Sequence, residues 1–221
     1  MGEFFQELSL EWPALLSGLK WTIVLSVAIT VSGLLGGLFL LFLLTHPSRS
    51  VRLLANAYVT FFIGTPLLAL LFLMYYGLPT IGLGLSPFAA AFIGFTLNIS
   101  AYNARYLMSG YKAIAAAELT AAVAMGYRRR QIYLYLILPQ SFRYAVPALI
   151  SQTINNLKDS SVAFLIQCDG FLSFIQNFTA QNFYFFRGYA FAAVGYLIMV
   201  FLLTLAARKI QQRTRIPGFA G

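Results

Sequence analysis

Residues 21–44 read WTIVLSVAITVSGLLGGLFLLFLL, and this stretch contains no charged side chain. A helix needs roughly 20 apolar residues to cross the hydrocarbon core of a bilayer, so the stretch is long enough for one crossing. Similar apolar stretches lie near residues 57–76, 88–108, 144–167 and 189–207. The sequence therefore predicts an all-α membrane protein with about five transmembrane helices, and we expect one transmembrane domain over residues 1–221.

The overall composition supports a chain that lives in a lipid bilayer. Hydrophobic residues make up 60% of the sequence and charged residues only 10%, whereas soluble domains carry about 25% charged residues. The net charge is +9. The basic residues stand at the ends of the apolar stretches, which is typical of membrane proteins and does not indicate a nucleic-acid partner.

The distribution of basic residues predicts the orientation of the chain. Lys and Arg are enriched in cytoplasmic loops. On that side we place the connection after the first span, the segment between the third and fourth spans, and the tail, with Arg49, Arg52, Lys112, Arg128, Arg129, Arg130, Arg143, Arg208, Lys209, Arg213 and Arg215. The charge distribution predicts a multi-pass membrane protein with the N-terminus outside and the C-terminus in the cytoplasm.

Few residues are available for catalysis or metal binding. His46 is the only histidine and Cys168 the only cysteine. No disulfide can form within the chain, and no zinc-ligand spacing exists. We therefore expect no catalytic residue, no metal site and no cofactor in this chain.

The cytoplasmic segment 112–139 is the longest stretch without a clean span. Its first part is rich in alanine, the best helix former, and Gly126 is placed as a helix C-cap before three arginines. A second helix is expected from 131 to 138, ending at Pro139. Two interpretations remain open: an interfacial loop whose arginines contact lipid phosphates, or a rigid docking element for a partner.

Polar residues interrupt the third predicted span. Asn98, Tyr102 and Arg105 follow i, i+4, i+7 spacing and share one helix face. Arg105 lies near the inner end of the span. It either extends to the cytoplasmic headgroups or lines an aqueous pathway.

The fourth predicted span carries a larger polar set, which lipid cannot solvate. It comprises Gln152, Asn155, Asn156, Lys158, Asp159, Ser160 and Ser161. In one interpretation these residues bind neighbouring helices and hold the bundle together. In the other they line a pathway for a zwitterion, which needs a donor for its carboxylate and an acceptor for its ammonium.

An ordered set of motifs resembles the permease subunits of polar amino acid ABC importers. The EAA loop of that family reads Glu-Ala-Ala, three residues, Gly, nine residues, then Ile-x-Leu-Pro. This chain matches its spacing with Thr120-Ala121-Ala122, Gly126 and Leu136-Ile137-Leu138-Pro139. Further similar pieces are residues 62–67 (FIGTPL), 96–98 (TLN), 138–140 (LPQ), 157–161 (LKDSS) and the tail at 213–218.

The resemblance implies a type I importer permease of the bacterial cytoplasmic (inner) membrane, whose 112–139 loop carries a cytoplasmic coupling helix. Two permease subunits, the same chain twice or this chain with a paralogue, would form the pathway, each contributing half. An ATP-binding cassette ATPase dimer would hold ATP and Mg, and a periplasmic or lipid-anchored binding protein would deliver the amino acid. The chain itself has no Gly-x-x-x-x-Gly-Lys-Ser/Thr loop. The coupling residues implied are Glu118, Thr120, Ala121, Ala122, Gly126, Tyr127, Arg128 and Pro139.

Two positions depart from the family pattern. Thr120 replaces the motif glutamate, with Glu118 two positions earlier. Arg105 stands where members often carry a glutamate. A positive charge in the pathway would favour a substrate with an extra carboxylate, such as glutamate or aspartate.

Two other functions fit the sequence less well than that of an ABC permease. An ion-driven secondary transporter is disfavoured because no internal repeat is visible and five spans cannot divide into equal halves. A membrane-embedded enzyme is disfavoured because the polar set within the spans lacks a His/Cys cluster or paired carboxylates.

Overall fold

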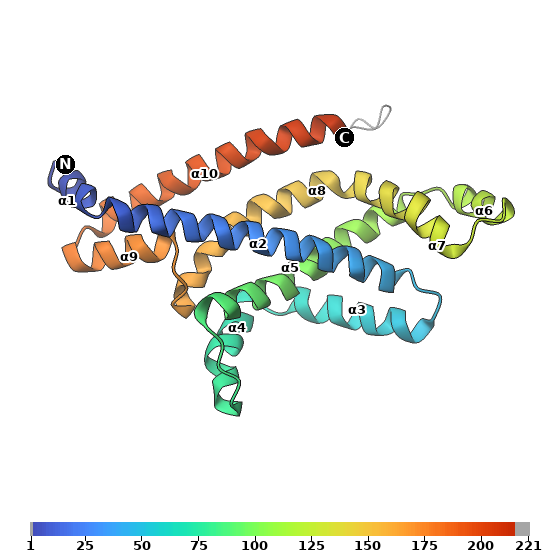
Figure 1. Cartoon of the computed structure of the whole chain (residues 1–221), viewed down its shortest axis with the longest axis horizontal. Helices are drawn as coiled ribbons and strands as arrows, with labels where there is room; N and C mark the ends of the chain where they lie inside the picture. Colours follow the sequence, from blue (N-terminus) through green and yellow to red (C-terminus); the bar gives the residue numbers. More distant parts are fainter. Residues whose placement is uncertain (1, 215–221) are drawn as a thin grey trace. The chain divides into compact units, whose positions relative to one another are not determined.

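A computed structural model describes residues 2–214, and within these residues it contains helices and no strand. The arrangement is drawn in Figure 1. The α-helices are α1 (Gly2–Leu10), α2 (Trp12–Leu44), α3 (Arg49–Gly64), α4 (Leu67–Phe72), α5 (Pro87–Lys112), α6 (Ala116–Ala124), α7 (Arg129–Gln131), α8 (Leu138–Asp159), α9 (Phe171–Asn182) and α10 (Phe185–Thr214). The prediction of an all-α fold is confirmed. The tail motif at 213–218 lies at the end of the described residues, and Arg215 lies outside them.

Shorter helical segments connect the α-helices. Wider π segments cover Leu73–Gly77 and Ile132–Ile137, and 3-10 segments cover Leu78–Ile81 and Ser160–Ile166. Among the described helices, α2 and α10 are each long and apolar enough to cross a membrane, and the interrupted pair Arg49–Gly64 and Leu67–Ile81 would make a third span. The other two predicted spans fall on α5 and on α8 with its 3-10 extension, so the count of five remains a prediction.

The chain divides into two compact units, and the division falls within α2, α5, α8 and α10. Of the described residues, the first unit contains 2–31, 66–96 and 154–205, and the second contains 32–65, 97–153 and 206–214. Each unit therefore takes a part of these four helices.

In the first unit, α2 lies close to the backbone at the start of α9. A side chain at Gly18 would collide with the carbonyl of Gly170. Thr22 of α2 accepts a hydrogen bond on Oγ1 from the backbone N–H of Phe171, at 2.8 Å. Phe171 packs in an apolar cluster with Leu15 and other buried residues. Cys168, just before this contact, is also buried.

The second unit is held together by apolar side chains and by a close helix contact at a glycine. Leu41, Leu107 and Ala145, from α2, α5 and α8, form one of its cores. Gly110 of α5 lies directly against the backbone of Ser141 in α8. This contact leaves no room for a side chain at position 110, so glycine is required there by packing.

The helix is interrupted at Gly64-Thr65-Pro66, because α3 ends at Gly64 and α4 begins at Leu67. Pro66 has no N–H, so it cannot donate to the carbonyl of Phe62, four residues earlier. The Asn98 side chain supplies a donor instead, with Nδ2 2.8 Å from that oxygen. Asn98 thus satisfies the carbonyl that the break leaves open.

The prediction that a helix ends at Pro139 is wrong. α8 begins at Leu138 and passes through Pro139, because the preceding turns form the π segment Ile132–Ile137. A π turn is wider than an α turn and accommodates the proline ring. Within the fourth predicted span, 144–167, the α-helix ends at Asp159 and a 3-10 segment continues to Ile166.

Candidate functional site

The turn after α6 has a fixed geometry that only a few residues can adopt. Gly126 has a φ of +80°. The backbone N–H of Tyr127 donates to the carbonyl of Ala122 at 3.1 Å, and the N–H of Gly126 donates to that of Val123 at 3.0 Å. These two bonds make the Schellman motif that ends a helix on a left-handed glycine. The prediction of Gly126 as a C-cap is confirmed.

α6 is packed onto the segment that follows it. Ala122 is buried against Ile132 and Ile137, and Leu119 packs on the same cluster. Figure 1 shows α6 and α7 side by side at one end of the second unit. The small Ala122 side chain allows the two segments to approach closely, so the turn is one rigid element and not a loose loop.

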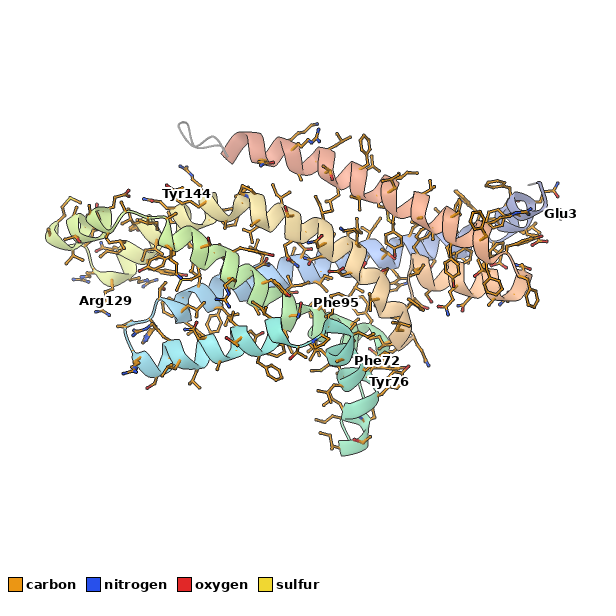
Figure 2. The ribbon with its side chains drawn as sticks, turned by 180° about the vertical axis from the view of Figure 1, so that it is seen from behind. Glu3, Phe72, Tyr76, Phe95, Arg129 and Tyr144 are labelled. Atoms are coloured by element: carbon orange, nitrogen blue, oxygen red, sulfur yellow. The ribbon has the colours of Figure 1, made fainter. Side chains whose placement is uncertain are left out.

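The opposite side of this turn presents apolar and basic groups to its surroundings. The exposed fractions are 64% for Val123, 70% for Met125 and 46% for Tyr127. The three arginines that follow are also exposed, and Figure 2 shows the Arg129 side chain projecting away from the ribbon. Exposed apolar side chains beside cations are a common composition for a protein interface.

Thr120 and Glu118, the two residues at and near the position of the motif glutamate, each make a hydrogen bond within the chain. Thr120 Oγ1 donates to the carbonyl of Ala116 at 2.9 Å, within its own helix. Glu118 Oε2 accepts from Nε2 of Gln140 at 2.9 Å, which ties α6 to the first turn of α8. Of the predicted coupling residues, Ala122 lies inside the packed cluster, whereas Glu118, Thr120, Ala121, Gly126, Tyr127, Arg128 and Pro139 are exposed.

The polar residues of α5 differ in exposure along the helix. Asn98 is buried and bonded to the α3 carbonyl, Tyr102 is half-buried, and Arg105 is exposed. Asn98 therefore has a demonstrated structural contact. Arg105 is the member of this set that remains accessible.

The structure divides the polar residues of α8 and its extension into two groups. Gln152, Asn156 and Ser160 are buried, whereas Asn155, Lys158 and Asp159 are exposed. Ser160 Oγ donates to the carbonyl of Leu157 at 2.8 Å, and Asn156 Nδ2 donates to Thr30 Oγ1 at 3.1 Å. The buried residues therefore make hydrogen bonds within the chain, whereas Asn155, Lys158 and Asp159 lie at the surface of the described structure.

Sequence reasoning missed the partner of Gln152. The Tyr106 hydroxyl of α5 donates to Gln152 Oε1 at 3.3 Å. Tyr106 follows Arg105 directly, so it points from a different side of α5 than the i, i+4, i+7 set. A tyrosine inside an apolar span was the available signal, because its hydroxyl needs a partner when it is buried.

The described residues contain no cluster of three or more His, Cys, Asp or Glu side chains that could hold a metal ion. What the structure offers is an exposed turn and a polar helix face. Both features suit assembly and transport.

Comparison with known proteins agrees with this arrangement. The family described as binding-protein-dependent transport system inner membrane component matches residues 29–216. The chain is 30% identical over 203 residues to the L-cystine transport system permease protein TcyB of Bacillus subtilis, covering 91% of this chain and 87% of TcyB. It is 36% identical over 154 residues to the probable amino-acid ABC transporter permease protein PatM of Vibrio harveyi, covering 68% and 69% of the two chains.

A solved structure extends the similarity to the fold. A chain from the crystal structure of an amino acid ABC transporter with histidines superposes with a TM-score of 0.86 at 27% identity, over 95% of this chain and 98% of the other. The sequence match and the fold agree along nearly the whole length. This chain belongs to the binding-protein-dependent transport system inner membrane component family, the permease subunits of ABC importers.

Proposed function

We propose that this permease subunit of an amino acid ABC importer forms half of the translocation pathway and couples to its ATPase through residues 112–139. The observation that carries the proposal is the turn at Gly126. Its backbone is fixed by the Schellman bonds, while Val123 and Met125 stand exposed beside the arginines. A short helix with a rigid end and an apolar surface can dock in a groove of another protein.

The packing of this turn gives a route by which movement would reach the membrane. α6 contacts the π segment through Ala122 and contacts α8 through Glu118 and Gln140. α8 then carries Asn155, Lys158 and Asp159 on its exposed side. A displacement of α6 by the ATPase would therefore move the helix that holds the proposed pathway residues.

The partner that covers the exposed polar face of α8 is proposed to be a second permease subunit, either the same chain or a paralogue. Exposed charges within a span require a protein or aqueous neighbour. The same argument favours Arg105 as a pathway residue. The orientation we propose, with the N-terminus outside, rests on the basic residues of the 45–52 connection and of the 112–143 segment.

Co-purification tests the proposed function. The chain, expressed with a neighbouring ATPase and binding protein, should purify from detergent as a complex. Its ATP hydrolysis should rise when the binding protein and a transported amino acid are added. Purification of the chain alone, with uptake into liposomes that needs no ATP, would instead establish a secondary transporter.

Replacing Arg105 with glutamate is expected to lower uptake of acidic amino acids by at least tenfold relative to neutral ones. The reversed charge would repel the extra carboxylate of glutamate or aspartate. Uptake of both substrate classes is measured in proteoliposomes. Arg143→Glu, an exposed charge reversal on α8, serves as the control. Equal loss for all substrates, or no loss, would show that Arg105 does not select the substrate.

A further inference from the structure

A broad cavity in the second unit lies next to the coupling turn but is separate from its exposed apolar surface. Its volume is about 1060 Å³. Three parts of the chain wall it: the end of α2 with its connection to α3, the last turns of α5, and residues 129–137. The exposed residues Val123, Met125 and Tyr127 do not line this cavity.

The walls of this cavity are fixed by bonds within the chain. The Phe42 ring meets Tyr133 edge-to-face with centroids 5.3 Å apart, and the Tyr133 hydroxyl donates to the carbonyl of Leu38 at 3.3 Å. Arg52 donates from Nη1 to the carbonyls of His46 and Pro47, at 2.8 and 2.7 Å. The connection after α2 is thus held in place by Arg52, one of the arginines that line the cavity.

The cavity is strongly cationic. Arg52, Arg129 and Arg130 line it, and no Asp or Glu does. The two bonds that hold Arg52 use two of the five N–H donors of a guanidinium, which leaves donors for a ligand. Arginine is suited to phosphate and carboxylate oxygens because its donors form a planar fork.

Most of the remaining wall is apolar, although Thr45, His46 and Tyr111 also line the cavity. Leu44, Met108, Ile132, Leu134 and Ile137 lie beside the arginines. A free phosphate would leave this surface unused. An amino acid zwitterion would find no Asp or Glu carboxylate in the cavity lining to accept hydrogen bonds from its ammonium group. Cations beside an apolar wall instead match an amphiphile that has an anionic head and a hydrocarbon tail.

We propose that this cavity binds an anionic phospholipid, with its phosphate between Arg52, Arg129 and Arg130 and an acyl chain along the apolar wall. The position along the chain agrees with this occupant, because Leu44 ends the first apolar stretch, where a span reaches the headgroups. Basic pockets beside spans on the cytoplasmic side are suited to anionic headgroups. The site goes beyond the proposed coupling function, because it requires neither the ATPase nor the transported amino acid.

Native mass spectrometry of the full chain in detergent tests the proposal. The probes are dioleoyl phosphatidylglycerol and dioleoyl phosphatidylcholine. The anionic lipid should bind at least tenfold more tightly, and Arg129→Gln combined with Arg130→Gln should remove that preference. Arg143→Gln, which removes an exposed arginine outside the cavity, should leave it unchanged. Inorganic phosphate at millimolar concentration should not displace the lipid.

A variant of the apolar wall gives a second, independent measurement. Leu134 is 41% exposed, so Leu134→Gln should fold and should weaken binding of the long-chain lipid more than that of dihexanoyl phosphatidylglycerol. The proposal is overturned if the double arginine variant retains the preference for the anionic lipid. Displacement of the lipid by inorganic phosphate would overturn it too, and would identify a site for soluble phosphate.

Discussion

Gly126→Val is expected to lower ATP-driven uptake by at least tenfold while the chain still inserts in the membrane. Gly126 has a φ of +80°, and a left-handed backbone costs a residue with a Cβ about 1–2 kcal/mol, with β-branched residues the least tolerant. Relief of that strain would break the bonds from Tyr127 and Gly126 to the end of α6 and redirect the chain. Uptake in proteoliposomes and retention of the ATPase on the purified chain measure the effect.

Gly84→Val is a matched control for this variant. A side chain at Gly84 would meet open space, and Gly84 does not have the left-handed backbone of Gly126. Gly126→Asn should keep most of the activity, because asparagine tolerates the left-handed region. Full transport by Gly126→Val would show that this turn does not serve coupling.

Gly110→Val is expected to have the largest effect on stability. The first atoms that a new side chain would meet are backbone atoms of Ser141, so no rotamer change can relieve the contact. Overpacking of a core costs about 1–3 kcal/mol and occasionally more, and a backbone collision belongs at the upper end. The amount of monodisperse chain that survives heating in detergent should fall sharply.

Ser109→Val supplies the comparison for Gly110→Val. Ser109 is the neighbouring residue of the same helix and is exposed, so the same new side chain enters without a collision. Its melting behaviour should match that of the unchanged chain. If both variants melt alike, α5 and α8 are not packed through position 110.

The sequence was sufficient to predict features that depend on backbone chemistry. A glycine after an alanine-rich stretch predicts a C-cap, and Gly126 forms one. A proline that lacks an N–H predicts a break, and α3 ends two residues before Pro66. Long uncharged stretches predict apolar helices, as in α2 and α10.

Features that depend on non-local packing could not be predicted in this way. Pro139 was expected to end a helix, but the π segment before it lets α8 continue. The bonds of Asn98 to Phe62 and of Glu118 to Gln140 join residues distant in the sequence. No periodicity along one helix encodes such pairings.

The polar residues of the fourth predicted span are a second case in which burial could not be predicted from the sequence. The sequence placed Gln152, Asn155 and Asp159 in one polar set, yet the chain buries Gln152 and exposes the other two. Burial depends on which side of α8 the neighbouring helices occupy. The accessible members, rather than the whole set, are therefore the ones we place in the pathway.

The buried thiol of Cys168 has a practical consequence for labelling. Burial, reinforced by the charge of Asp169, raises the pKa of this thiol to about 11. The thiolate is the reactive form, so at neutral pH only on the order of one molecule in ten thousand is ionised at this position. Since Cys168 is the only cysteine, a maleimide should leave the natural chain almost unmarked. Maleimide labelling of a cysteine introduced as Ser48→Cys or as Gly84→Cys can then show on which side of the membrane that position lies. The native cysteine does not have to be removed first.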